Sequence, residues 1–181
     1  GGEAEVFLDP NTFSTDGTSG LQGTFYSPDG SLLTYLVSEG GSDWRKAIVI
    51  RTSDKAQVGD TLRQLKFTGI AWNGNEGFYY ARTDAGKLFS RVDYNNLMYH
   101  RMGTPQSTDK LVFSGKGETP RRVGGYITED QRFLVMSAST TTSGNELYLQ
   151  DLKKPGSTLT PVVTDFENRS EEHTSELQSP Y

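Results

Sequence analysis

The chain has no cysteine among its 181 residues. This excludes disulfide bonds, thiolate metal ligands and a cysteine nucleophile, but it leaves the compartment open because many secreted bacterial proteins also lack cysteine. A surplus of basic charge is missing too, since 18 Lys and Arg stand against 23 Asp and Glu, for a net charge of −5. Phosphate neutralisation needs a basic patch or stripe, so we expect no nucleic-acid partner.

Long apolar runs and metal-binding motifs are missing as well. No stretch approaches the ~20 apolar residues that cross a bilayer, so we expect no membrane partner. The chain begins at Gly1 without a charged-then-apolar leader. The sequence leaves the protein's compartment open between cytoplasm and periplasm, with the cytoplasm favoured. Two histidines and no D-x-D-x-D-G loop predict neither a metal site nor a cofactor.

Turn formers and aromatic residues are abundant. The chain has 20 Gly, nine Tyr and nine Phe, while residues of the hydrophobic class make up 33%. Short strands joined by tight turns fit this composition, because aromatic and β-branched residues favour strands and Gly, Asp, Asn and Pro favour turns. No useful length shows helical spacing of apolar residues. We therefore expect an all-β fold.

Three similar units follow one another along the chain. Each is a short apolar strand, a tight polar turn, a second strand, a polar loop and a third strand. The turn anchors Asp29, Gly74 and Asp130 recur at spacings close to the ~40–50 residues of propeller blades. The expected strands are Leu21–Ser27, Leu32–Val37 and Ala47–Arg51; Phe67–Trp72, Phe78–Ala81 and Leu97–Met102; and Gly125–Thr128, Phe133–Ser137 and Leu147–Leu152.

A fourth strand is expected to close each unit, at Thr61–Leu65, Lys110–Ser114 and Leu159–Val163. Val6–Leu8 is expected to be the closing strand of a preceding unit. The units predict a partial β-propeller of about three four-stranded blades. Three blades cannot close a ring, and open edge strands invite aggregation, so we expect a piece of a larger fold.

The last thirteen residues, 169–181, look foreign to the rest of the chain. They show neither the apolar–polar alternation of a strand nor turn-forming residues that would connect them to the preceding strands. They resemble an in-frame translation of a common sequencing adapter, whose opening AGATCGGAAGAG encodes Arg-Ser-Glu-Glu. A natural polar tail is the alternative. We therefore divide the chain into a propeller segment, residues 1–168, and a disordered artefactual tail, residues 169–181, in which His173 carries no chemistry.

A series of strings resembles, in order, the propeller of the prolyl oligopeptidase family. The resemblance covers residues 3–168 and implies a seven-bladed propeller that caps an α/β-hydrolase domain, whose Ser-Asp-His triad cleaves peptides after proline. It further implies two partners, that C-terminal hydrolase domain in cis and short proline-containing peptides. The strings are Glu5–Asn11, Asp16–Thr18, Tyr26–Gly30, Gly41–Trp44, Leu65–Phe67, Ala71–Trp72, Phe78–Tyr80 and Gly124–Gly125.

The catalytic elements of such an enzyme are not in this sequence. It contains no G-x-S-x-G nucleophile elbow, and His100 is the only histidine outside the tail. His100 lies between aromatic residues in an expected strand, which favours a structural or surface role. We expect no catalytic residue in this chain and no peptidase activity from these 181 residues alone.

Four residues are candidates for substrate binding. Phe67 and Val123 begin or precede first strands, while Asp43 and Thr142 lie in second-to-third loops, so all four should share one rim of the blades. The resemblance implies that Phe67 lines an apolar pocket and that Asp43 pairs with a hydrolase arginine at the domain interface. Val123 stands where the family has methionine, and Thr142 lies near a position where some members have cysteine. The alternative for Phe67 is an aromatic side chain in the core of a buried strand. The alternative for Asp43 is a solvated aspartate in a hairpin turn.

Two other functions remain open at this stage. A non-catalytic propeller that binds protein or glycan has only the generic Ser27–Gly30 turn in its favour. A related peptidase with dipeptidyl or acylaminoacyl preference is the second, because residues outside this segment set most of the specificity. A downstream G-x-S-x-G followed by Asp and His would distinguish a peptidase from a binding module.

Overall fold

Strands dominate the part of the chain that the computed structural model describes, namely residues 7–13, 17–83, 94–140 and 145–164. Eleven strands and two short 3-10 helices, η1 (Pro10–Thr12) and η2 (Gln106–Thr108), occur there. The expected all-β partial propeller is confirmed. The tail that we interpret as foreign lies outside the described residues.

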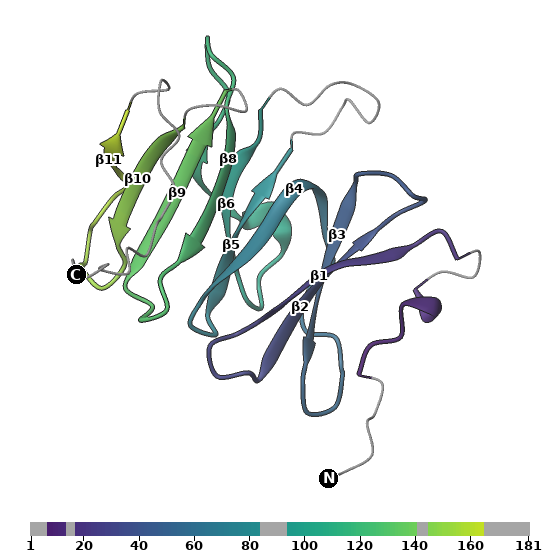
Figure 1. The fold of residues 1–181 in the computed structure, drawn as a ribbon. Helices are drawn as coiled ribbons and strands as arrows, with labels where there is room; N and C mark the ends of the chain where they lie inside the picture. The colour runs from purple at the N-terminus through teal and green to yellow at the C-terminus, as the bar shows by residue number, and fades with distance from the viewer. Residues whose placement is uncertain (1–6, 14–16, 84–93, 141–144, 165–181) are drawn as a thin grey trace, which may run out of the picture.

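The strands form three antiparallel blades, which stand side by side in Figure 1. Each blade has four strands, and the last strand of blade one is the first part of β4. Blade one contains β1 (Gly20–Tyr26), β2 (Leu32–Ser38), β3 (Arg45–Arg51) and the start of β4 (Leu62–Asn73); blade two contains the rest of β4, β5 (Gly77–Arg82), β6 (Asn96–Arg101) and β7 (Lys110–Ser114); blade three contains β8 (Arg122–Ile127), β9 (Phe133–Ser139), β10 (Glu146–Asp151) and β11 (Thr160–Val163).

Strand β4 belongs to two blades at once. Leu65 pairs with Arg45 of β3, whereas Ile70 pairs with Tyr80 of β5. The sequence predicts two separate strands here, but Lys66 is the single residue between them and no turn former interrupts them. The chain instead bends within one strand, at Gln64 and Phe67, whose φ angles of 64° and 52° lie in the left-handed region. Blades one and two therefore share one seven-stranded sheet.

The strand expected at Val6–Leu8 is wrong for the two of its residues that the structure describes. Phe7 and Leu8 belong to no strand, and Val6 lies outside the described residues. Both side chains pack instead against the buried cluster of blade one that contains Leu33. The chain then turns into η1 at Pro10, which lacks the N–H that a strand would use for pairing.

The first turns of blades one and three are built alike. The Ser27 hydroxyl donates to Asp29 at 2.9 Å and accepts from the Leu32 N–H. In blade three the Thr128 hydroxyl donates to Asp130 at 2.6 Å and accepts from the N–H of Phe133. The repeat seen in the sequence thus corresponds to one turn chemistry, in which a carboxylate binds the hydroxyl two residues before it.

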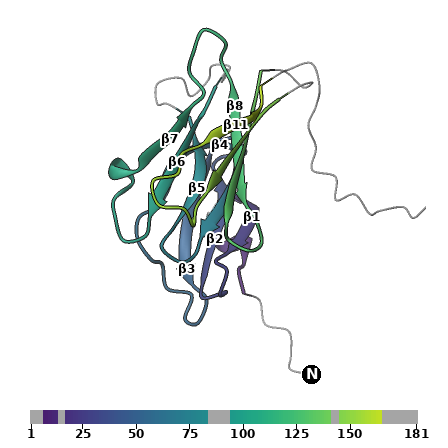
Figure 2. The same ribbon diagram turned by 90° about the vertical axis from the view of Figure 1, so that its left-hand side faces the viewer.

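Apolar side chains fill the spaces between neighbouring blades. One buried cluster joins blades one and two around Leu36, Trp72 and Phe78. A second joins blades two and three around Tyr79, Val123 and Met136. The first strands of successive blades, which are β1, the second part of β4 and β8, pack against one another. In Figure 2, β1 and β7 lie on opposite sides of the molecule. The blades are therefore held mainly by face-to-face burial of apolar surface.

Turn-to-turn hydrogen bonds link the blades along the edge that carries these tight turns, the lower edge in Figure 1. The Asn75 amide donates to Asp29 at 2.6 Å, and the Gly74 N–H donates to the Gln131 side chain at 2.9 Å. Asp29 also accepts from the N–H and hydroxyl of Ser31. These donors, with Ser31 first, hold the pKa of Asp29 far below its ordinary value.

Acid should therefore weaken the fold through Asp29. A carboxyl whose pKa is lowered on folding adds stability above its unfolded pKa of about 4, and this stability is lost as pH falls through the lowered value. We expect Asp29→Asn to reduce the fall in melting temperature between pH 5 and pH 3, measured by circular dichroism. Asp60→Asn, at an exposed position, is the control. Equal pH profiles for the wild type and Asp29→Asn would contradict this prediction.

Candidate functional site

The opposite edge of the blades, the upper edge in Figure 1, carries the loop between β2 and β3, the bend of β4 and the start of β8. Asp43 and Trp44 lie in the loop between β2 and β3, Lys66 and Phe67 at the bend of β4, and Arg122 at the start of β8. Lys66 Nζ lies 3.5 Å from Asp43 Oδ2 and 5.3 Å from the centre of the Phe67 ring. Asp43 and Phe67 therefore share one rim, as the alternation of strand direction predicts.

Phe67 is a surface aromatic rather than a core one. The residue is 49% exposed, although its neighbours along β4 bury large side chains. Its φ of 52° is unusual for a bulky residue and costs of the order of 1–3 kcal/mol. Backbone strain of this kind clusters at sites of function, and here it directs an aromatic ring away from the core.

Lys66 connects Asp43 to the two aromatic side chains of the rim. Its ammonium lies 5.5 Å from the centre of the Trp44 ring and forms the ion pair with Asp43. The Lys66 side chain is only 15% exposed, whereas that of Asp43 is 72% exposed. An ion pair with one partner in solvent contributes little free energy. Asp43 therefore has a carboxylate that can change partners at low cost.

Val123 is buried, unlike the half-exposed Phe67. The Val123 side chain is 3% exposed and packs in the cluster between blades two and three, and its N–H donates to Asn95 Oδ1 at 2.6 Å. In this structure Val123 is a core residue, and its role in substrate binding stays a prediction. Thr142 lies outside the described residues.

Sequence reasoning missed three members of the rim: Trp44, Lys66 and Arg122. Trp44 and Lys66 stand next to Asp43 and Phe67 in the sequence, and that adjacency was the one available signal. Arg122 comes from another blade, and its guanidinium lies 5.2 Å from the centre of the Phe67 ring. This contact depends on the packing of β4 against β8, for which the sequence has no local signal.

His100 belongs to a buried network inside blade two. The residue is 1% exposed, and its Nδ1 lies 2.8 Å from Asp109 Oδ1. Tyr80 donates to the other oxygen of Asp109 at 2.6 Å, and burial raises the pKa of Tyr80 above its ordinary value. Gln106 donates to Tyr80 and binds both the N–H and the carbonyl of Arg63. The structural role expected for His100 agrees with these contacts.

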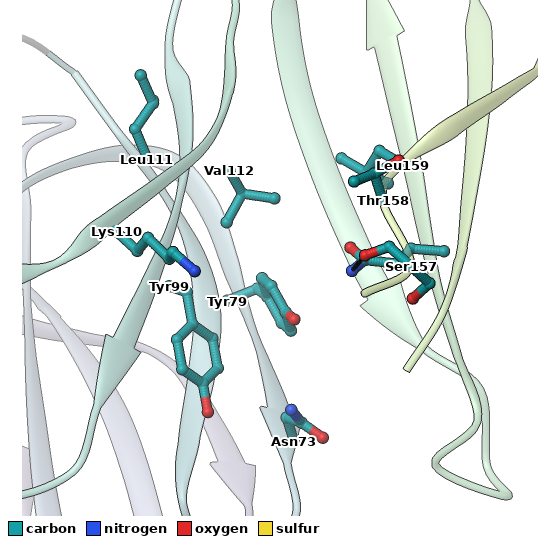
Figure 3. A pocket seen from close by; sticks show the side chains of 10 residues that line it. Asn73, Tyr79, Tyr99, Lys110, Leu111, Val112, Ser157, Thr158 and Leu159 are labelled. Atoms are coloured by element: carbon teal, nitrogen blue, oxygen red, sulfur yellow. Dashed lines mark hydrogen bonds between the residues drawn. The ribbon is translucent and has the colours of Figure 1, made fainter. Parts of the chain in front are cut away.

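A groove of about 390 Å³ lies between blades two and three, away from the rim (Figure 3). Tyr79, Tyr99 and Lys110 line it from blade two, and Ser157 to Leu159 lie opposite on blade three. The centres of the Tyr79 and Tyr99 rings are 4.8 Å apart. Burial, followed by the neighbouring Tyr99, raises the pKa of Tyr79 to about 12, so its hydroxyl stays protonated.

The described residues hold neither a candidate metal site nor a helix that could span a membrane. No group of three or more His, Cys, Asp and Glu side chains in residues 7–13, 17–83, 94–140 and 145–164 is arranged to hold a metal ion. Within the same ranges, no helix is long and apolar enough to cross a membrane. The rim formed by Asp43, Trp44, Lys66, Phe67 and Arg122 brings three charged and two aromatic side chains together.

Comparison with known proteins identifies the fold and its family. Residues 1–178 match the family model described as the N-terminal β-propeller domain of prolyl oligopeptidase. The chain belongs to the prolyl oligopeptidase family. The match extends past Arg169, where we place the start of a foreign tail, and the nature of that tail stays a prediction.

Curated relatives of this prolyl oligopeptidase segment support the assignment. A prolyl endopeptidase of Elizabethkingia miricola is 44% identical over 171 residues, which cover 92% of this chain and 24% of the relative. A prolyl oligopeptidase of Omphalotus olearius is 32% identical over 160 residues, which cover 79% of this chain and 21% of the relative. The chain thus spans about a quarter of the length of these relatives.

Solved structures share the fold. One chain from a study of two prolyl endopeptidases superposes with a TM-score of 0.80 at 32% identity, covering 91% of this chain and 23% of that one. Prolyl oligopeptidase B from Galerina marginata, bound to a 35-residue hydrolysis and macrocyclisation substrate, gives 0.79 at 29% identity, covering 90% and 25%. The three blades are therefore part of the prolyl oligopeptidase propeller.

Proposed function

We propose that this segment serves a serine endopeptidase that cleaves peptides after proline. Its rim of Asp43, Trp44, Lys66, Phe67 and Arg122 faces the hydrolase domain and lines the acyl side of the substrate pocket. The single observation that carries this assignment is the strained, half-exposed Phe67 ring at a rim shared with Asp43. Family membership supports it, as do relatives named prolyl endopeptidase.

The chemistry of the rim suits restriction and positioning rather than bond cleavage. An exposed aromatic ring can bury an apolar group of a peptide, and Asp43 can pair with a cation on the hydrolase domain. The triad must come from sequence outside this chain, because no G-x-S-x-G elbow is present. We therefore expect the purified 181-residue chain to have no peptidase activity; turnover that a serine-directed phosphonate abolishes would contradict this.

Phe67→Ala tests the role of the rim in the full-length enzyme. Loss of an aromatic contact worth about 1–3 kcal/mol should lower kcat/KM for a blocked glycyl-prolyl peptide by roughly 5- to 150-fold, mainly through KM. Tyr26→Ala is the matched control, since Tyr26 is 56% exposed at the opposite end of its blade. Equal losses in both variants would indicate a general effect on the fold and refute a binding role for Phe67.

The reading frame after Asn168 tests both the parent protein and the tail. We expect genomic DNA amplified outward from this segment to continue through further blades into a G-x-S-x-G motif, followed by Asp and His. A genomic Arg-Ser-Glu-Glu-His sequence that then stops would show that the tail is natural. The non-catalytic binding module would then become the better account.

A further inference from the structure

One asparagine in the turn between β4 and β5 is followed directly by glycine. Asn73–Gly74 is the only such pair in the chain, since none of the other six asparagines precedes a glycine. We propose that Asn73 is a deamidation site that the contact between blades two and three keeps unreactive, and that reacts when these blades separate. This inference is independent of the proposed function, because it concerns the propeller segment alone.

The reaction needs only these two residues and water. The backbone nitrogen of Gly74 gives up its proton to the solvent and attacks Cγ, the side-chain amide carbon of Asn73. A bond forms between this nitrogen and Cγ, the Cγ–Nδ2 bond breaks, and Nδ2 takes up a proton and leaves as ammonia. Water then opens the five-membered imide at either carbonyl and leaves aspartate or isoaspartate at position 73. Glycine favours the first step because it has no Cβ to crowd the attacking nitrogen.

The attacking nitrogen is held by the neighbouring blade. The N–H of Gly74 donates to the side-chain oxygen of Gln131 at 2.9 Å, and Gln131 lies in the turn between β8 and β9 of blade three. This hydrogen bond retains the proton that must leave, and it directs the nitrogen toward blade three instead of toward Asn73. The bond breaks when the two blades move apart at this edge, so the reaction depends on local opening.

The asparagine is held as well. Asn73 is the last residue of β4 and pairs with Gly77 of β5. Closure of the imide ring requires rotation about the Cα–C bond of Asn73, which would break this extended pairing. The side chain is also engaged: burial is the main cause that raises the pKa of Tyr99, and a hydrogen bond with the Asn73 side chain opposes it. Both reacting groups are therefore fixed in the folded blade.

Burial is not what protects Asn73. Its side chain lines the groove of about 390 Å³ between blades two and three, together with Tyr79 and Tyr99 (Figure 3), and the residue is only partly buried. Water reaches the amide from this groove, and ammonia leaves through it. Protection therefore depends on the hydrogen bonds at Gly74 and Asn73, and it ends when they open.

The product changes the turn permanently. Isoaspartate continues the chain through its side-chain carbonyl, so it adds one methylene to the backbone next to Gly74. Both products place a carboxylate near Tyr99, where Glu76 already contributes a negative charge. The hydrogen bond from Gly74 to Gln131 is then harder to re-form, so an opening of the blades leaves a lasting mark.

Peptide-mapping mass spectrometry of the 181-residue chain measures the reaction. The chain is incubated at mildly alkaline pH, either folded or in guanidinium chloride, and the converted fraction of Asn73 is followed in time. We expect the folded chain to react more slowly than the unfolded one by about tenfold or more, because the reaction has to wait for local opening. Asn75 is more exposed but is followed by Glu76; it is the internal control and should stay intact.

Gln131→Gly separates the contact between the blades from a general change in stability. Gln131 has a φ of 58°, which glycine adopts without strain, so the turn is kept while the acceptor is removed. Deamidation of Asn73 should speed up about fivefold, the factor that corresponds to one lost hydrogen bond. Lys55→Gly is the matched control, since Lys55 has a φ of 60° and contacts Phe7 at blade one. Its rate should equal that of the wild type.

Three results would overturn the inference. The first is an equal rate in the folded and the unfolded chain, the second is a Gln131→Gly rate equal to that of the wild type, and the third is conversion of Asn75 as fast as that of Asn73. Circular dichroism and thermal unfolding show that the blades of each variant are intact, and the comparison of folded with unfolded wild type tests the proposal without any variant. None of these outcomes depends on peptidase activity, so the proposed function holds or fails separately.

Discussion

Alanine at Gly77 is expected to destabilise the propeller by about 3 kcal/mol, at the upper end of the range for overpacked sites. Gly77 lies at the start of β5, opposite Arg101 of β6. A Cβ at this position would lie 2.2 Å from the His100 carbonyl oxygen and 2.7 Å from the Tyr99 hydroxyl oxygen. Backbone atoms in the middle of a sheet cannot move aside as a flexible side chain can, so the strands must separate locally.

Urea unfolding followed by circular dichroism measures this change. Gly124→Ala is the matched control, because Gly124 lies in β8 and an added Cβ there has no heavy atom within 4 Å. We expect the control to be neutral or slightly stabilising, since alanine restricts the unfolded chain more than glycine does. If Gly77→Ala and Gly124→Ala unfold at the same urea concentration, the prediction that β6 leaves no room for a side chain at Gly77 is wrong.

Removal of the Asp109 carboxylate is expected to cost about 3 kcal/mol of stability. Asp109→Ala leaves two buried groups without their partner, the His100 ring nitrogen and the Tyr80 hydroxyl. The side chains of His100 and Asp109 are 1% and 0% exposed, so water does not replace the lost bonds easily. Gln106 would also lose its fixed neighbour, which weakens the link from η2 to the Arg63 backbone.

Two further variants make the Asp109 prediction specific. Asp109→Asn keeps one acceptor oxygen and should lose less stability than Asp109→Ala. Asp60→Ala removes an exposed carboxylate and should change the free energy of unfolding by less than about 0.5 kcal/mol. The network has no structural role if Asp109→Ala is as stable as Asp60→Ala in thermal and urea unfolding.

Most strands could be located from the sequence because their signals are local. Lys110–Ser114 was predicted with the bounds that the structure has, and the turns at Asp29 and Asp130 were found from their residue types. Each such turn satisfies its own backbone groups within a few residues, so its conformation depends little on distant contacts. The strand expected at Val6–Leu8 was wrong at Phe7 and Leu8, because apolar composition alone cannot supply a partner strand.

The candidate site could be predicted in part. The alternation of strand direction predicts Asp43 and Phe67 on one rim. In the structure Lys66, the chain neighbour of Phe67, contacts both Asp43 and the Phe67 ring there. Trp44 and Lys66 were missed although they are adjacent in sequence to those two residues, since a cation over an aromatic ring has no sequence signature. Arg122 was missed because its contact with Phe67 crosses from one blade to another.

The all-β class, the three repeated units, their tight turns and the resemblance to one enzyme family follow from the sequence alone. All of these are properties of residue type and spacing, which act over a few residues or recur at a fixed period. The tertiary structure alone decided that β4 bends at Phe67 to join two blades, that His100 and Asp109 are buried together, and that Lys66 and Arg122 meet at one ring. These features depend on which surfaces the blades bury against one another, and that packing brings together residues that are distant in the chain.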